Sequence, residues 1–330
     1  MTSKDHMLLS IEDLRVYFWG NDKVARAVDG MSLEVGPGET VCLVGESGCG
    51  KTVSALTVLG LIPRPPGEIQ GGRVVFKGRD LVGLSDEEMQ RVRGREIAMV
   101  FQEPMTSLNP VFTIGDQIAE AILVHEAKAQ AVAKRCVRLL ADVGIPDAEA
   151  RLKDYPHQLS GGQRQRVMIA MALACNPKLV IADEPTTALD VTVQAQILDL
   201  FGELQKRRDM AVLYITHDLG VVRKIADRVY VMYAGIIVEQ GRASDIFHDP
   251  CHPYTQGLLA SLPDRMKRGK KLKSIPGTVP DPAFKPKGCP FHPRCGLAVA
   301  SCRQDLPEMC HWGEKHLSRC PVVYEMKERR

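Results

Sequence analysis

Short apolar runs alternate with amphipathic segments along most of the chain. Residues 41–44 and 179–182 are apolar runs of the length of buried strands, and residues 211–216 and 228–232 continue the series. Residues 191–206 repeat apolar positions every three to four places, which predicts an amphipathic helix. This alternation favours an α/β fold in which helices cover both faces of a parallel sheet.

A largely helical segment interrupts the alternation at about residues 105–175. Within it, residues 114–125 and 129–143 have apolar positions at helical spacing. Before it, residues 8–62 predict two short strands followed by a strand, a loop and a helix, and residues 68–100 predict another strand pair and a polar helix. We therefore expect a helical lobe inserted into the main domain.

The composition changes near residue 263. Residues 263–288 are rich in Lys, Arg and Pro and poor in large apolar side chains, and a Cys-rich stretch follows them. We divide the chain into a main domain of residues 1–262 and a C-terminal extension of residues 263–330.

The charge is spread unevenly, although the net charge is only +3 and the charged fraction of 25% is ordinary. Residues 265–330 carry 15 Lys and Arg against 6 Asp and Glu. A basic tail of this kind is usually a solvated surface, but it could also lie near anionic lipid or an acidic partner. Nothing in the total charge points to nucleic acid.

The sequence predicts neither a secretion signal nor a membrane span. Residues 1–6 lack the apolar core of a signal peptide, and no apolar run approaches the ~20 residues that cross a bilayer. Any membrane role would therefore be peripheral and act through partner chains.

A glycine-rich loop follows the first buried strand. Residues 45–52, Gly-Glu-Ser-Gly-Cys-Gly-Lys-Thr, fit the phosphate-loop pattern G-x-x-x-x-G-K-[ST] and stand between a predicted strand and a predicted helix. The glycines let backbone N–H groups form a nest for phosphates, and the helix adds its positive N-terminal end. Lys51 is expected to reach the β- and γ-phosphates, and the Thr52 hydroxyl to ligate Mg²⁺.

Two carboxylates follow the apolar run at 179–182. Asp183 is expected to hold Mg²⁺ directly or through water, and Glu184 to orient and deprotonate an attacking water. One acid at a strand end is commonplace. Two in succession, downstream of a phosphate loop, predict hydrolysis of a nucleoside triphosphate.

Further motifs make the chain resemble the ABC ATPases. Residues 159–163, Leu-Ser-Gly-Gly-Gln, resemble the family's signature sequence. Gln102, Asp190 and His217 stand in the order of its Q-loop, D-loop (Ala-Leu-Asp) and switch histidine. The resemblance covers about residues 8–250. It implies an ABC nucleotide-binding domain with a parallel-sheet core, an antiparallel β part and a helical lobe.

The resemblance also implies roles for individual residues. The signature would complete the ATP site of a second subunit, head to tail, His217 would contact the γ-phosphate, and Gln102 would couple the γ-phosphate and Mg²⁺ to a transmembrane subunit. We expect catalytic roles for Glu184, His217 and Gln102 and Mg²⁺ contacts from Thr52, Gln102 and Asp183. The residues expected to bind ATP are Phe18, Gly45, Ser47, Gly48, Cys49, Gly50, Lys51, Thr52, Gln102, Ser160, Gly161, Gly162, Gln163, Asp183 and Asp190.

The aromatic ring that would stack on adenine is less sharply defined. Tyr17, Phe18 and Trp19 all precede the phosphate loop at a suitable place. The register relative to Leu14 favours Phe18, and simple core packing would suit any of the three.

Within the ABC ATPases, the chain resembles the dipeptide and oligopeptide importers. The segments that carry this resemblance are the phosphate loop, residues 101–110, the His-Pro-Tyr-Thr at 252–255 and the Cys-rich extension. The resemblance implies a homologous second ATPase, two transmembrane permease subunits, an external binding protein and a place on the cytoplasmic face of the inner membrane. Importers of nickel and other small solutes share the pattern, so the cargo stays open.

Half of the ten cysteines fall in the last 42 residues. Because no secretion signal is expected, clustered thiols point to a metal site, and four thiolates can hold zinc or an iron–sulfur cluster. Resemblance to the peptide importers implies a [4Fe–4S] cluster, and the absence of tight Cys pairs agrees with this. The expected ligands are Cys289, Cys295, Cys302 and Cys320, whereas Cys310 lies outside the pattern.

Two alternatives from other classes remain open. A non-transport ABC ATPase acting on ribosomes usually has two cassettes, and one acting on DNA has a long coiled coil, neither of which the sequence predicts. A redox sensor with a regulatory ATP site would instead lose turnover on removal of the cluster.

Overall fold

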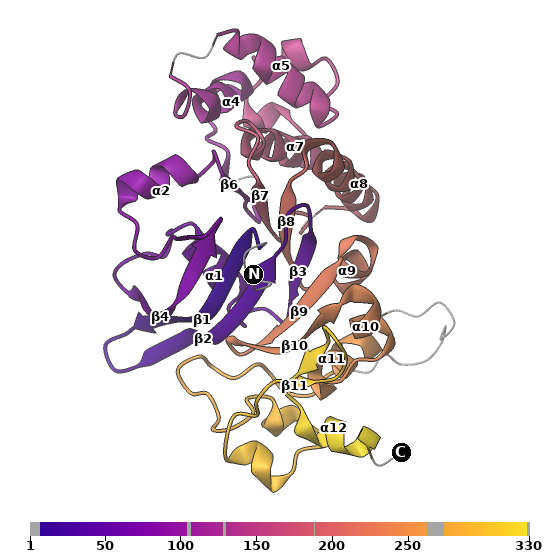
Figure 1. Ribbon diagram of the computed structural model, residues 1–330. Helices are drawn as coiled ribbons and strands as arrows, with labels where there is room; N and C mark the ends of the chain where they lie inside the picture. Colours follow the sequence, from indigo (N-terminus) through magenta and orange to yellow (C-terminus); the bar gives the residue numbers. More distant parts are fainter. Residues whose placement is uncertain (1–6, 104–106, 128–129, 188, 263–273, 329–330) are drawn as a thin grey trace. The chain divides into compact units, whose positions relative to one another are not determined.

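The computed structural model describes residues 7–103, 107–127, 130–187, 189–262 and 274–328 (Figure 1). Residues 1–6, the expected start of the helical lobe at 105, Ala188 of the D-loop motif and the linker residues 263–273 lie outside the described residues. The chain divides into two compact units. The first comprises the chain start to Leu8 and residues 36–39 and 83–214, and the second comprises residues 9–35, 40–82 and 215–330.

The second unit contains an antiparallel sheet with the strand order β2-β1-β4-β5. Its strands are β1 (Leu9–Trp19), β2 (Val24–Val35), β4 (Gly67–Phe76) and β5 (Arg79–Asp80). Ile11 and Leu14 of β1 are both buried although they are three residues apart, because the register shifts between them. Asp13 within this bulge has a φ of 46°, and its carbonyl faces Gly72, where a Cβ atom would lie only 2.5 Å away.

A second sheet of this unit has the order β11-β12-β10-β9-β3. Its strands are β3 (Thr40–Val44), β9 (Arg228–Tyr233), β10 (Ile236–Arg242), β11 (Cys310–His311) and β12 (Leu317–Ser318). β3 and β9 are parallel, whereas the tail strand β12 pairs antiparallel with β10 through Glu239 and Ser318. The C-terminal tail therefore continues a sheet begun at residue 40.

The helices of this unit follow its strands. They are α1 (Lys51–Val58), α9 (Leu219–Ile225), α10 (Ala243–His248), α11 (Pro253–Ala260), α12 (Pro321–Glu328) and the short turns η4 (His292–Arg294) and η5 (Ala300–Arg303). Pro253 stands at the start of α11, where its missing N–H costs nothing.

The first unit contains the strand order β8-β7-β6, in which β6 and β7 are parallel. The strands are β6 (Ile97–Val100), β7 (Leu179–Asp183) and β8 (Ala211–Thr216), of which residues 211–214 belong to this unit. All five residues of β7 are buried, as expected for a strand covered on both faces.

Most of the first unit is helical. Its helices are α2 (Asp86–Val92), α4 (Ile114–Leu123), α5 (Val132–Asp142), α6 (Ala148–Arg151), α7 (Gly161–Ala172), α8 (Val191–Arg208) and the turn η2 (Pro156–Gln158). Capping boxes at Ser85, Thr113 and Ser160 start α2, α4 and α7, since each hydroxyl accepts a backbone N–H three residues on. The α/β fold is confirmed, and the strands and helices predicted from hydrophobic spacing are present. β1 and β2 have 11 and 12 residues, so the prediction of two short strands before the phosphate loop was wrong. None of the helices in the described residues has both the length and the apolar character needed to cross a membrane.

Candidate functional site

The phosphate loop lies in the second unit, between β3 and α1. Gly48 and Gly50 have φ values of 78° and 106°, in the left-handed region that glycine tolerates. A Cβ atom on Gly45 would lie 2.2 Å from the Met232 carbonyl oxygen, and one on Gly50 would lie 2.4 Å from that of Ala27. Close backbone packing therefore requires glycine at Gly45, the backbone conformation favours it at Gly48, and both apply at Gly50.

Lys51 begins α1 and points its ammonium group back into the loop. Its Nζ donates to the carbonyl oxygens of Gly45 at 2.8 Å and Glu46 at 3.1 Å, and the residue is only 5% exposed. No side chain caps the N-terminus of α1, where Gly50 is the N-cap residue. The first N–H groups of this helix therefore have no capping side chain as acceptor.

Two further side chains of the loop motif, Thr52 and Cys49, differ in placement. Thr52 is exposed, whereas Cys49 is fully buried and its Sγ lies 3.9 Å from Nζ of Lys51. Burial raises the pKa of the Cys49 thiol. Any contact of Cys49 with phosphate would therefore come from its backbone N–H.

The first unit brings Gln102 and Glu184 together at the ends of β6 and β7. The Gln102 amide nitrogen lies 3.5 Å from a Glu184 carboxylate oxygen, which also accepts a 3.1 Å hydrogen bond from the Thr187 hydroxyl. Glu184 has a φ of 45°, which a non-glycine residue rarely adopts. Such a conformation at a carboxylate is common at functional sites. Asp183, the preceding residue, is buried at 3% exposure.

The signature residues start α7 in the same unit. The Ser160 hydroxyl accepts from the Gln163 N–H at 3.3 Å, and the Gln163 side chain accepts from the Ser160 N–H at 2.9 Å. Ser160 and Gly161 are exposed, while a Cβ atom on Gly162 would lie 2.8 Å from Val193. The motif thus forms a capped helix start whose first two residues, Ser160 and Gly161, are exposed.

The two remaining motif residues end up at loop–helix junctions. Asp190 is the N-cap residue of α8 and accepts N–H bonds from Thr192 at 3.0 Å and Val193 at 2.9 Å. His217, in the second unit, is exposed directly after β8. Asp218, next to it, caps α9.

The three aromatic candidates at the end of β1 have different surroundings. The Tyr17 hydroxyl donates a 2.6 Å hydrogen bond to Asp29, and burial, then Asp29, raise the pKa of Tyr17. Phe18 is half-buried with its ring against Gly67, and Trp19 is 49% exposed. Tyr17 is therefore held by Asp29, and the expectation for Phe18 stays a prediction.

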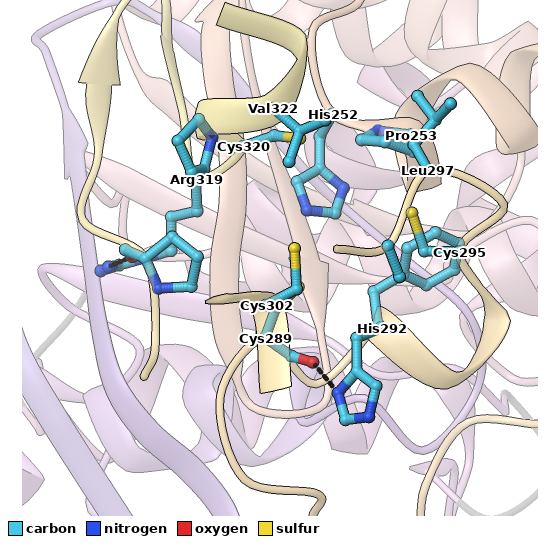
Figure 2. Close-up of a pocket in the computed structure, with 14 residues that line it drawn as sticks. His252, Pro253, Cys289, His292, Cys295, Leu297, Cys302, Arg319, Cys320 and Val322 are labelled. Atoms are coloured by element: carbon cyan, nitrogen blue, oxygen red, sulfur yellow. Dashed lines mark hydrogen bonds between the residues drawn. The ribbon is translucent and has the colours of Figure 1, made fainter. Parts of the chain in front are cut away.

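The four cysteines that the sequence singles out line one pocket of the C-terminal tail (Figure 2). They come from four separate places: before and after η4, within η5, and directly before α12. The backbone N–H of Cys289 donates to the Cys302 carbonyl at 2.8 Å, which holds two of these segments together. Cys310, in β11, does not line the pocket.

Burial changes the acidity of the thiols in this pocket. Burial raises the pKa of Cys289 and Cys295, and it raises the pKa of Cys320 to about 12. A mononuclear zinc site needs sulfurs about 3.8 Å apart, from Zn–S bonds of about 2.3 Å. No three of these four sulfurs, all of which lie in the described part of the chain, are within 4.8 Å of one another. In the described residues, the four thiols therefore do not form the close set that a single bound ion would need.

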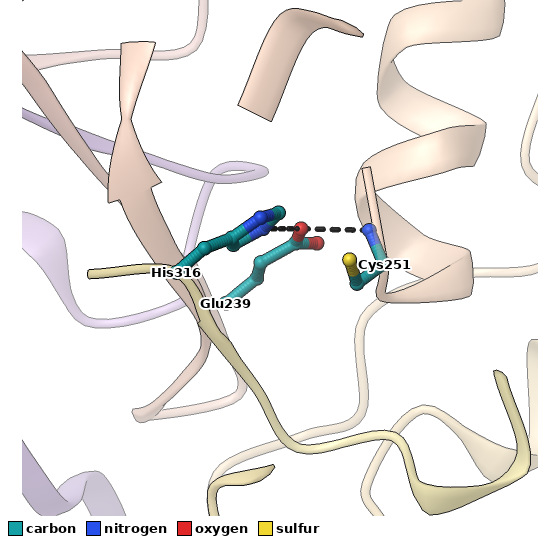
Figure 3. Close-up of side chains that lie close together, drawn as sticks. All are labelled: Glu239, Cys251 and His316. Carbon is teal, nitrogen blue, oxygen red and sulfur yellow. Dashed lines mark hydrogen bonds and ion pairs between the residues drawn. The ribbon is translucent and has the colours of Figure 1, made fainter. Parts of the chain in front are cut away.

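A buried polar cluster, which the sequence did not predict, lies nearby on β10 (Figure 3). One Glu239 oxygen accepts from the Cys251 N–H at 2.7 Å and is 2.8 Å from Nε2 of His316, and the other accepts from the His252 N–H at 2.8 Å. Glu239 is 0% exposed. Both carboxylate oxygens thus have protein donors, so the cluster joins the tail to β10 without needing a metal.

Comparison with known families gives two matches along the chain. The family described as ABC transporter matches residues 28–187. The family described as the C-terminal region of oligopeptide/dipeptide transporters matches residues 238–302, which include three of the four pocket cysteines.

Comparison with curated proteins gives similarity over nearly the whole chain. The dipeptide transport ATP-binding protein DppD of Bacillus subtilis is 50% identical, over 95% of this chain and 94% of its own. The oligopeptide transport ATP-binding protein OppD of the same organism is 52% identical, over 94% of this chain and 87% of its own.

Among solved structures, the ATP-binding cassette MJ0796 is similar. It was determined as a dimer in a post-hydrolysis state bound to ADP and Pi. It is 26% identical, with a TM-score of 0.64, and the match covers 71% of this chain and 98% of MJ0796.

Proposed function

The chain belongs to the ATP-binding subunits of the ABC transporters that import di- and oligopeptides, and on this premise we propose how its residues bind and hydrolyse ATP. It is an ABC ATPase whose hydrolysis is coupled to transport. The observation that carries the assignment is the similarity over nearly the full length, because it spans both the ATPase motifs and the C-terminal extension.

ATP binding is assigned first to the phosphate loop. The backbone N–H groups of Gly45, Ser47, Gly48, Cys49 and Gly50 surround the phosphates, and Lys51 reaches the β- and γ-phosphates. The uncapped start of α1 and the left-handed glycines support this role. Thr52, Gln102 and Asp183 hold Mg²⁺, and Phe18 stacks on adenine.

Hydrolysis is assigned to Glu184 as the general base for in-line attack of water on the γ-phosphate. Gln102, which lies beside Glu184, senses the γ-phosphate, and His217 contacts it. The unusual backbone conformation of Glu184 supports a functional role for this carboxylate.

The second half of each ATP site is assigned to an opposing ATPase subunit. In each subunit, the start of α7 would face the ATP held by the other subunit, and Asp190 would lie beside it. The α7 residues assigned to this role are Ser160, Gly161, Gly162 and Gln163. The dimer found for the similar cassette MJ0796 supports this arrangement. ATP binding closes the dimer, and hydrolysis reopens it.

The cellular setting follows from the relatives. We assign two transmembrane permease subunits, a homologous second ATPase and an extracytoplasmic binding protein as partners, with this subunit on the cytoplasmic face of the inner membrane. The names DppD and OppD support peptide cargo. The main domain is assigned to residues 1–262 and the extension to residues 263–330.

The cysteine pocket is assigned to a [4Fe–4S] cluster held by Cys289, Cys295, Cys302 and Cys320. The gathering of four thiols around one pocket supports the proposal. When bound, the cluster would cross-link the four segments that carry these cysteines, so its role would be structural.

Transport by the assembled complex in lipid vesicles tests the function. We expect peptide-loaded binding protein to stimulate ATP hydrolysis and peptide uptake, and Lys51→Ala to abolish both. ATP hydrolysis stimulated by nickel but not by peptides would overturn the peptide assignment. ATP hydrolysis that no loaded binding protein stimulates would overturn the transport role.

A further inference from the structure

The phosphate loop carries a carboxylate whose partner comes from the far end of the chain. Glu46, the second residue of the loop, forms a two-pronged ion pair with Arg294, with N–O distances of 2.7 and 3.0 Å. The Arg294 side chain is only 5% exposed and that of Glu46 is 32% exposed, so solvent reaches the pair from the Glu46 side alone. Pairs with this fork geometry are among the strongest in proteins.

Further contacts fix the guanidinium of Arg294 in place. Its Nε donates to the Pro276 carbonyl at 2.8 Å, and its Nη1 lies 3.3 Å from the Tyr233 hydroxyl. On the other side, the Glu46 N–H donates to the Tyr254 hydroxyl at 2.9 Å. Both the backbone and the side chain of Glu46 are therefore held by residues C-terminal to β8.

The tail segment that carries Arg294 also lies along β2. The Arg26 N–H donates to the Pro282 carbonyl at 3.0 Å, and the ammonium group of Lys285 is 3.6 Å from Asp29. The Phe284 ring lies under the ammonium group of Lys23 at 4.5 Å. These contacts give the tail a defined register beside the loop, so the position of Arg294 does not depend on Glu46 alone.

A carboxylate in a phosphate-binding loop opposes the binding of a polyanion, because like charges repel strongly where solvent screening is weak. We propose that Arg294 is a positioning residue that acts through Glu46: it compensates the charge of that carboxylate in the phosphate loop and thereby sets the affinity for ATP. The proposal rests on the assignment of ATP binding to this loop, but not on which metal the cysteine pocket holds.

Replacing each half of the pair with a neutral side chain gives opposite expectations. Arg294→Gln leaves the Glu46 charge uncompensated, so we expect roughly tenfold weaker ATP affinity. Glu46→Gln leaves a positive charge near the phosphates, so affinity should be unchanged or tighter. The double variant should return to within about threefold of the unaltered chain. If the Glu46–Arg294 pair only held the loop mechanically, the affinity for ATP would instead fall in both single variants. It would fall at least as far in the double variant.

The experiment is a titration of the full chain with a fluorescent non-hydrolysable ATP analogue and Mg²⁺, with KM and kcat measured in the assembled complex. The loss in Arg294→Gln should appear in the dissociation constant and KM, with kcat little changed. Arg294→Lys should restore most of the affinity, and it covers the case in which Arg294→Gln fails to fold. Arg303→Gln is the matched control, since this exposed arginine also adjoins a pocket cysteine.

Two outcomes would overturn the proposal: unchanged affinity in a folded Arg294→Gln chain, or weaker binding in Glu46→Gln. Failure of the unaltered chain to bind the analogue would instead count against the ATP-site assignment itself.

Discussion

The Glu239 carboxylate lies 2.8 Å from Nε2 of His316, and both residues are buried. Glu239 belongs to β10 and His316 to the turn between β11 and β12, so the pair fixes the tail hairpin on the sheet of the second unit. Because Glu239 also accepts the backbone N–H groups of Cys251 and His252, one side chain joins three segments.

Glu239→Gln should destabilise the chain by about 3 kcal/mol, because the amide offers one acceptor where the carboxylate offers two, and turns an NH₂ group toward a donor. The loss should appear as a lower midpoint in urea unfolding. Glu314→Gln, an exposed change two residues from His316, is the control and should leave the midpoint in place. Equal midpoints for both variants would contradict the anchoring role.

A second prediction concerns acid stability and His252. This residue is fully buried, and its Nδ1 accepts the Tyr254 N–H at 3.1 Å as the N-cap of α11. Burial lowers the pKa of His252 to about 4 from the usual 6.5, partly opposed by Glu239. Between pH 6.5 and 4 the unfolded chain therefore binds a proton that the folded chain does not, and stability falls as the pH falls.

His252→Asn should remove this share of the pH dependence, up to about 3 kcal/mol between pH 7 and 4, because Asn caps the helix without taking up a proton. Unfolding midpoints at several pH values measure it. His248→Asn, at an exposed site four residues earlier, should keep the slope of the unaltered chain. A slope that His252→Asn leaves intact would show that other groups cause the acid loss.

The phosphate loop at residues 45–52 could be recognised from the sequence, whereas the contacts of Glu46 and Glu239 could not. The phosphate loop is contiguous, so its spacing alone predicts a strand, a nest and a helix. The Glu46–Arg294 pair spans 248 positions, and the Glu239–His316 contact spans 77. Such contacts depend on how the tail folds back, which no local pattern encodes.

Some signals were nevertheless present. Glu239 follows three apolar residues of a strand, and a charge at a buried strand position indicates a specific partner. Tyr254 lies in a segment that marks the peptide importers, although its contact with the Glu46 backbone was not foreseen. The four pocket cysteines could be grouped from the sequence because thiols that cluster along a chain indicate a metal site.

Glu184→Gln should retain ATP binding and lose at least about 10²-fold in turnover, because the amide can hold a water but cannot accept its proton. Steady-state hydrolysis by the assembled complex measures the loss, and a nucleotide-binding titration shows that the site is intact. Glu203→Gln, on α8, provides a control carboxylate outside the motifs. Near-normal turnover by Glu184→Gln would remove this residue from the role of general base.

The isolated chain should be a weak ATPase, because each site needs Ser160 and its neighbours from an opposing subunit. Activity should rise more steeply than linearly with chain concentration, or should require the second ATPase. Sedimentation measures the oligomeric state at each chain concentration, and a hydrolysis assay measures the rate of ATP turnover at the same concentrations. A chain that sediments as a monomer and turns over at the full rate would contradict the composite site.

The cysteine pocket should hold about four irons per chain after anaerobic purification, with the brown colour of an iron–sulfur cluster. Because burial raises the pKa of Cys320 to about 12, this thiol stays protonated until a metal displaces its proton, and Cys320→Ala should abolish iron binding. Cys310→Ala is the matched control, since Cys310 is in the same tail but does not line the pocket, and it should retain the iron. ATP binding should survive in both variants, because the cluster is assigned a structural role. One zinc per chain, with no iron and no visible absorbance, would overturn the cluster assignment and leave the ATPase assignment intact.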